Sequence, residues 1–152
     1  MSRGFQATVE IGRPPDEVWR AITDFGLAPQ WMPGIARMSE LNDDPIGPGK
    51  RYETTFAQSG RGKGTIVALA EWEPENKRFA LASTQSGMHA LYRYSLTPSA
   101  DGTATTVTLD AACEARTPVM NLVHPLINIL MAKHDRRQMP LLKAMIEGEG
   151  RA

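Results

Sequence analysis

Hydrophobic and polar residues alternate at the start of the chain. Apolar residues lie at every second position from residue 5 to residue 11, and polar residues fill the positions between them. Because successive side chains of a strand point to opposite faces, this period of two predicts a β-strand with one face against a core. The apolar face consists of Phe5, Ala7, Val9 and Ile11.

The period changes to a helical one over residues 13–25. Two prolines suit a helix start, and the two acidic residues that follow suit the positive N-terminal end of the helix dipole. Val18, Ile22 and Phe25 fall on one stripe with Trp19 beside it. The segment therefore predicts an amphipathic helix of about three turns that ends at the following glycine.

Residues 26–35 carry two prolines around Trp31 and Met32. Proline removes a backbone donor and crowds the preceding turn, which excludes a long regular helix here. A single helical turn that presses the large apolar side chains inward fits the pattern. We therefore expect a second short, lid-like helical piece.

From Ile35 to Ala115 the chain has the pattern of successive strands separated by short turns. Six strands at hairpin spacing predict an antiparallel meander. The turn signals occupy residues 43–49, 59–64, 73–76, 86–87 and 98–102. The last two strands each predict one packed face, formed by Met88, Ala90, Tyr92, Tyr94 and Leu96 and by Val107, Leu109, Ala111 and Cys113.

The final 30 residues have a helical pattern that begins after Thr117 and Pro118. Pro125 and Pro140 predict a kink near one of them. One face of this helix combines Val123, Ile127, Leu130, His134, Leu141 and Met145. The whole pattern predicts an α+β fold in which a sheet curls around a long C-terminal helix, and we expect one domain over residues 1–152.

Composition narrows the function classes. Lys plus Arg and Asp plus Glu both count 17, so no net charge attracts nucleic acid or an anionic membrane. Cys113 is the one cysteine, which excludes an internal disulfide and fits a reducing compartment. No run approaches the ~18 apolar residues that cross a bilayer. We therefore expect a cytoplasmic protein with no nucleic-acid partner and no stable membrane insertion.

Several motifs together carry a family likeness. They are IGRPPDEVWRAITDF, APQWMPGI, PIGPGKRYETTF and LYRYSLTPSADGTATTVTL, followed by the C-terminal helix. Their order resembles the polyketide cyclase/dehydrase-like branch of the START-like (SRPBCC) superfamily over residues 4–147. The resemblance implies a helix-grip fold: a seven-stranded antiparallel sheet wrapped around a long C-terminal helix, two short helices after the first strand, and a hydrophobic cavity between sheet and helix.

The resemblance does not imply one activity, because the superfamily includes ligand carriers, receptors, cyclases, oxygenase subunits and chaperone activators. The oxygenase branch needs a Rieske cluster and a mononuclear iron site, and one Cys with three His cannot supply both. His124 and His134 lie ten residues apart on the predicted helix, too far to share a metal. We expect no metal and no cofactor, and the family supplies no catalytic residue.

Candidate ligand-binding residues combine apolar bulk with a few polar groups. Tyrosines and His134 can orient the polar end of a ligand, and large apolar groups can form the cavity mouth. Each has an alternative structural role in ordinary packing, and Arg93, Arg136 and Arg137 suit either a ligand carboxylate or a solvated surface. The predicted site consists of Trp31, Met32, Tyr52, Phe56, Met88, Tyr92, Tyr94, Leu130 and His134.

These residues favour one function and leave two alternatives. The favoured function is binding of a small hydrophobic molecule, such as a lipid, polyketide, isoprenoid or aromatic compound, in an internal cavity. The first alternative is a cyclase, aromatase or dehydratase that polarises a carbonyl in a dry pocket, which requires polar groups to converge. The second is a protein-interaction module, which requires a filled cavity and a large exposed apolar patch.

Overall fold

A seven-stranded sheet and the helices packed on it make up the described part of the computed structural model, which is residues 3–32, 35–41, 43–56, 64–85, 88–115 and 136–149. Each strand and short helix expected from the sequence is present, in the expected order. The elements are β1 (Arg3–Ile11), α1 (Pro15–Ile22), η1 (Phe25–Leu27), α2 (Ala28–Trp31), β2 (Ile35–Glu40), β3 (Arg51–Phe56), β4 (Gly64–Glu73), β5 (Arg78–Gln85), β6 (Met88–Pro98), β7 (Thr105–Ala115) and α4 (Gln138–Glu149).

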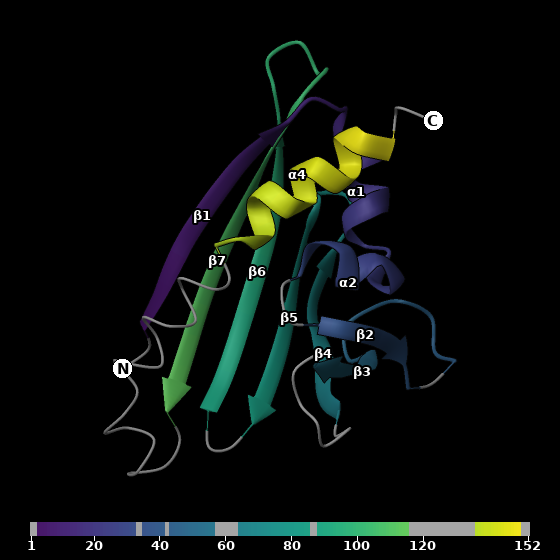
Figure 1. Cartoon of the computed structure of the whole chain (residues 1–152), viewed down its shortest axis with the longest axis vertical. Helices are drawn as coiled ribbons and strands as arrows, with labels where there is room; N and C mark the ends of the chain where they lie inside the picture. The colour runs from purple at the N-terminus through teal and green to yellow at the C-terminus, as the bar shows by residue number, and fades with distance from the viewer. Residues whose placement is uncertain are drawn as a thin grey trace.

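All strand pairs are antiparallel, in the order β1-β7-β6-β5-β4-β3-β2. The strands from β2 to β7 form the expected meander, and β1 joins its far end by pairing with β7. Figure 1 shows the twisted sheet with α4, α1 and α2 on one face. This arrangement confirms the helix-grip fold.

The face of the sheet that carries the helices is the apolar one. Val107, Leu109 and Ala111 of β7 are buried, as their alternation predicts, and so are Tyr94 and Leu96 of β6. Phe79 and Leu81 of β5 and Leu69 of β4 continue this surface through the register of the ladder. The side chain of Cys113 lies outside the described residues.

The first helix is shorter than the sequence predicts. It ends at Ile22, and the Thr23 hydroxyl donates to the carbonyl oxygen of Trp19 at 2.6 Å, a side-chain bond that competes with continuation of the helix. Phe25 therefore belongs to η1. Val18, Ile22 and Phe25 are nevertheless all buried, so the predicted stripe is correct although the helix changes type within it.

The predicted short helical piece is α2, a single turn. It buries Trp31 and Met32 in the core, with 1% and 5% of their surfaces exposed. Pro29 lies within the first positions of this turn, where a proline is tolerated, and the backbone N–H of Met32 donates to the carbonyl oxygen of Ala28 at its end. The prediction that this segment presses large apolar groups inward is confirmed.

The described C-terminal helix begins after a turn at residues 136–137, and Pro140 lies in its first turn. A proline there breaks no helical hydrogen bond, so it does not kink α4. Of the predicted helix face, Met145 is buried and Leu141 is half-buried, whereas the fully buried Leu142 was not predicted. Val123, Ile127, Leu130 and His134 lie outside the described residues.

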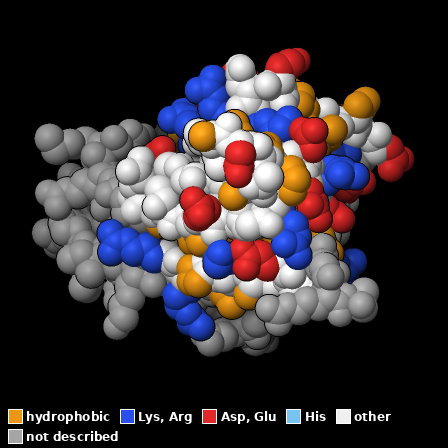
Figure 2. Space-filling model, turned by 90° about the horizontal axis from the view of Figure 1, so that it is seen from above, with side chains coloured by type: hydrophobic (Ala, Val, Ile, Leu, Met, Phe, Trp, Pro, Cys, Tyr) orange, Lys and Arg blue, Asp and Glu red, His pale blue; other side chains and the backbone are white. Residues whose placement is uncertain are grey.

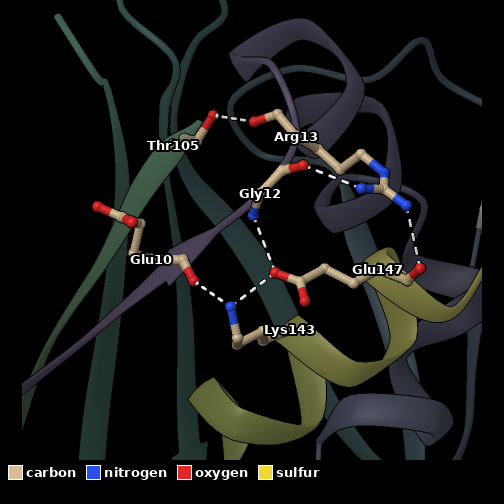
Figure 3. Close-up of polar contacts among 6 residues, drawn as sticks. All are labelled: Glu10, Gly12, Arg13, Thr105, Lys143 and Glu147. Atoms are coloured by element: carbon tan, nitrogen blue, oxygen red, sulfur yellow. Dashed lines mark hydrogen bonds and ion pairs between the residues drawn. The ribbon is translucent and has the colours of Figure 1, made fainter. Parts of the chain in front are cut away.

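A polar cluster holds the C-terminal half of α4 against the turn after β1 (Figure 3). The backbone N–H of Gly12 donates to the Glu147 carboxylate at 2.9 Å, and Arg13 donates to the Glu147 carbonyl oxygen at 3.1 Å. Lys143 bridges the Glu147 carboxylate at 2.6 Å and the Glu10 carbonyl oxygen at 2.8 Å. We call Gly12, Arg13, Lys143 and Glu147 the α4 clamp.

The opposite face of the sheet carries paired charges. Arg93 of β6 extends across Ala80 to Glu71 of β4, and the guanidinium Nε lies 2.7 Å from the carboxylate. At the end of the molecule that Figure 2 views from above, basic and acidic side chains also lie next to one another. Within the described ranges, no helix has the length and apolar character needed to span a membrane.

Candidate functional site

A pocket of about 310 Å³ lies where the short helical segment meets the end of the sheet that carries β2 and β3. Phe25 of η1, Met38 of β2, Tyr52 of β3 and Ile46 of the β2–β3 loop supply its apolar walls. We call it the η1 pocket. Its lining residues are Thr23, Asp24, Phe25, Gly26, Met38, Glu40, Ile46 and Tyr52.

Strand register explains why β2 and β3 contribute to one wall. Glu40 pairs with Tyr52, and Met38 pairs with Thr54, so these four side chains point to the same face. Met38, Tyr52 and Thr54 are buried, whereas the Glu40 side chain is 61% exposed at the edge. The pocket therefore has an apolar interior and an acidic rim.

Tyr52 is the principal polar group inside the pocket. Only 3% of its surface is exposed, and its ring meets Phe25 edge to face with 5.1 Å between centroids. Burial, and secondarily the negative charge of Glu40, raise the pKa of the Tyr52 hydroxyl, so it stays protonated at neutral pH. Within the described part of the chain this hydroxyl makes no hydrogen bond, which leaves it able to donate to a ligand.

Lys50 forms an ion pair with Glu40, one of the two carboxylates at the rim of the pocket. Its side chain is almost fully buried, and its Nζ lies 3.3 Å from a Glu40 oxygen. The same ammonium donates to the carbonyl oxygen of Asp44, which ties the β2–β3 loop to the strands. Gly49, with φ of +92°, makes the left-handed turn that directs Lys50 into this position. The loop that carries Ile46 is thus anchored beside the pocket.

A chain of aromatic rings leads from the pocket wall into the core beneath α4. Phe25 contacts Phe79 at 5.6 Å between centroids, Phe79 stacks on Tyr94 at 4.9 Å, and Tyr94 meets Trp31 edge to face at 5.7 Å. The Tyr94 hydroxyl donates to Gln138 of α4 at 2.7 Å. Rigid neighbours therefore fix the ring of Phe25 from behind.

The indole nitrogen of Trp31 has no hydrogen-bond partner in the described ranges, although it is buried. An unpaired buried donor costs about 1–3 kcal/mol. Trp31 fills space beside Tyr94 rather than lining the η1 pocket.

The structure separates the residues that the sequence proposes for the site. Tyr52 lines the η1 pocket, whereas Trp31, Met32 and Tyr94 are packed in the core and Tyr92 is half-buried on the inner face of β6. Phe56 and Met88 lie on β3 and β6, and their side chains are outside the described residues. Leu130 and His134 are outside them altogether. The arginines Arg93, Arg136 and Arg137 are exposed.

Sequence reasoning missed most of the pocket lining. Asp24, Glu40 and Ile46 come from a turn, a strand end and a loop that are separated along the chain, so no periodicity connects them. The available signal was the isolated apolar residue Ile46 within the turn sequence DDPIGPG. In the described ranges, no group of three or more His, Cys, Asp or Glu side chains is arranged to hold a metal ion.

Comparisons with known proteins identify the sequence family. The model of a family described as polyketide cyclase / dehydrase and lipid transport matches residues 2–147. Among curated proteins, no sequence match to this chain reaches significance.

Solved structures share the fold at low sequence identity. The Zhui aromatase/cyclase from Streptomyces sp. R1128 superposes with a TM-score of 0.81 at 13% identity, over 100% of this chain and 98% of that chain. A START superfamily protein from Mycobacterium smegmatis superposes with a TM-score of 0.72 at 20% identity, over 95% and 97% of the two chains. At these identities the similarity establishes the fold alone.

Proposed function

The chain belongs to the polyketide cyclase / dehydrase and lipid transport family, and from that premise we propose that it binds a small, largely apolar molecule in the η1 pocket. One observation carries the proposal. Apolar side chains from η1, β2, β3 and the β2–β3 loop converge on a space of about 310 Å³ that they do not fill. That volume lies at the lower end of the range for small-molecule sites, roughly 300–1,000 Å³.

The walls favour a ligand with a flat apolar body. Phe25 and Tyr52 offer ring surfaces, and the flexible Met38 adapts to different outlines. Burying such a body removes about 25 cal/mol of unfavourable hydration per Å² of apolar surface. An aromatic or polyketide-like molecule fits these walls better than a long unbranched chain does.

Ligand-dependent thermal unfolding tests this function. We expect a panel of aromatic, polyketide-like, isoprenoid and fatty-acid compounds to contain one class that raises the unfolding temperature in a dose-dependent way. At 100 times the dissociation constant, a ligand adds about 2.7 kcal/mol to the free energy of unfolding. No shift with any class would contradict the proposal.

A matched pair of isoleucines localises the site. Ile46 lines the pocket and Ile66 lies on β4 away from it, with 43% and 51% of their surfaces exposed. Ile46→Ala removes ligand contact with little loss of stability, so we expect about three- to tenfold weaker binding. Ile66→Ala should bind normally. Equal losses in both variants would place the ligand elsewhere.

Catalysis of a cyclisation or dehydration is the second candidate, and one observation favours it. Thr23, Asp24, Glu40 and Tyr52 converge on one pocket, which provides a protonated phenol that can donate to a ligand carbonyl and carboxylates that can accept a proton. The Zhui protein of the same fold is an aromatase/cyclase. Chromatography of the ligand recovered from the binding experiment distinguishes turnover from binding alone.

An interaction module is less well supported. Three large hydrophobic side chains in the described ranges are exposed, Leu41, Ile46 and Ile66, and Ile46 belongs to the pocket. An open pocket with few exposed apolar groups beside it favours a small molecule over a protein surface.

A further inference from the structure

Asp24 places a free carboxylate on the rim of the η1 pocket. It occupies the N-cap position of η1, where an Asp side chain ordinarily accepts a hydrogen bond from the first turn, yet it makes no such capping bond. No other hydrogen bond or ion pair in the described ranges engages this carboxylate. The side chain is therefore available to a molecule that enters the pocket.

The charges around the pocket do not cancel. Asp24 and Glu40 are the charged lining residues; Lys50 lies 3.3 Å from Glu40, whereas no ion pair in the described ranges engages Asp24. One negative charge remains, and it lies on Asp24. A ligand carboxylate would meet like charge there, whereas a cation would gain a charge-assisted hydrogen bond.

Tyr52 adds a hydrogen-bonding group at the inner end. Its hydroxyl is protonated and makes no hydrogen bond within the described part of the chain. A phenol both donates and accepts, so it tolerates either polarity in a ligand. The selectivity of the pocket for charge must then come from Asp24.

We propose that the η1 pocket selects amphiphiles whose polar end is a protonated amine, with Asp24 as the group that recognises the charge. The proposal rests on the proposed function, because it specifies the ligand class of the same pocket. The apolar body lies against Phe25, Met38 and Ile46, and the ammonium lies at the rim. Fatty acids and other carboxylate ligands are excluded from this position.

Three compounds that share one ring system test the proposal. They are 2-naphthylmethylamine, 2-naphthylmethanol and 2-naphthoic acid, titrated into the whole protein by calorimetry at about pH 7, where the amine is a cation and the acid an anion. Because Asp24 is exposed to solvent, we expect the amine to bind about three- to tenfold more tightly than the alcohol, and the acid most weakly.

Asp24→Asn supplies the decisive variant, because it removes the charge without removing any capping bond. We expect it to bring the affinity for the amine to within about twofold of that for the alcohol, both measured in the same variant. Glu75→Gln is the matched control, since it removes one carboxylate from the exposed turn between β4 and β5 and should leave the amine preference intact.

The outcomes separate this inference from the function on which it rests. If the alcohol binds and the amine has no advantage, or if the advantage survives in Asp24→Asn, the assignment of charge recognition is overturned and the apolar pocket stands. If none of the three binds, both the ligand class and the site are overturned. Tighter binding of the acid would reverse the proposed selectivity.

Discussion

The polar groups of the α4 clamp are paired with one another, whereas two polar groups of the η1 pocket are not. At the α4 clamp, Glu147 receives bonds from Gly12, Arg13 and Lys143, so each of its oxygen-bearing groups has a partner. At the η1 pocket, the Asp24 carboxylate and the Tyr52 hydroxyl have none in the described ranges. Paired groups hold elements together, whereas unpaired groups beside a space are available to a ligand.

The same contrast appears between two buried tyrosines. Tyr94 and Tyr52 are exposed to 1% and 3%, and each packs against a phenylalanine. Tyr94 donates to Gln138, while Tyr52 faces the pocket. Burial alone therefore does not identify a structural residue, and the hydrogen-bond partner of the side chain is the more informative property.

The largest effect should come from the apolar face of α4. Leu142 is fully buried beneath the helix, so Leu142→Ala should lower the free energy of unfolding by about 2–5 kcal/mol through lost burial and a residual cavity. Chemical denaturation measures this value. Ile66→Ala, which truncates an exposed side chain, should change it by less than about 0.5 kcal/mol. If Leu142→Ala lowers the free energy of unfolding by no more than Ile66→Ala does, the apolar face of α4 contributes little to the stability of the core.

Tyr94→Phe should have the next largest effect. It leaves the buried Gln138 oxygen without the 2.7 Å bond from Tyr94, and an unsatisfied buried acceptor costs about 1–3 kcal/mol. A double-mutant cycle with Gln138→Met measures the coupling, and the double variant should recover part of the loss because both partners are then apolar. A coupling energy of zero would show that this bond does not hold α4.

The α4 clamp predicts a smaller effect that depends on pH. The hydrogen bond from Gly12, followed by Lys143, lowers the pKa of Glu147 below its ordinary value of 4.5. A carboxyl whose folded pKa is depressed adds stability above the unfolded pKa and loses it as pH falls through the folded pKa. Glu147→Gln should therefore flatten the decline of the unfolding temperature between about pH 5 and pH 3.

Asp101 and Glu73 also have lowered pKa values, that of Asp101 reaching about 2, so the wild type retains part of its acid dependence for other reasons. The difference between variant and wild type is the relevant quantity. Glu75→Gln, a control on an exposed turn, should follow the wild-type curve. An unchanged curve for Glu147→Gln would show that the clamp contributes no stability through ionisation.

The sequence predicted the packed core under α4 better than it predicted the lining of the η1 pocket. Alternation along β7 identified Val107, Leu109 and Ala111 as buried, because a strand face is a property of neighbouring residues. On α4 the pattern correctly predicted Met145 as buried, but it included the half-buried Leu141 and missed the fully buried Leu142. Local periodicity thus predicts the buried face of a strand more accurately than that of this short helix.

The pocket could not be predicted in the same way. Asp24 and Glu40 are of residue types that usually lie at the solvated surface. Lys50 follows a Pro-Gly turn, where a lysine is also ordinarily exposed. Its burial depends on Gly49 and on the carboxylate across the β2–β3 pair. Tyr52 was predicted as a cavity residue because an apolar ring with a hydroxyl is common there, and it lines the η1 pocket.

The smallest expected effect on stability is the most informative one. Tyr52→Phe removes a hydroxyl that makes no hydrogen bond in the described part of the chain, so the free energy of unfolding should change by less than about 0.5 kcal/mol. The same substitution at Tyr94 should cost more, although both rings are buried to the same degree. Parallel denaturation of the two variants makes the comparison.

Ligand binding should show the reverse order. Tyr52→Phe should weaken 2-naphthylmethanol about threefold or more, since it deletes the one polar group at the inner end of the pocket that can bond a neutral hydroxyl. Tyr94→Phe should leave that affinity within about twofold, because Tyr94 contacts the pocket only through Phe79 and Phe25. If Tyr52→Phe destabilises the protein as much as Tyr94→Phe and leaves binding unchanged, the Tyr52 hydroxyl has a structural role. The distinction between paired polar groups at the α4 clamp and unpaired ones at the η1 pocket would then be wrong for Tyr52, the residue on which it depends most.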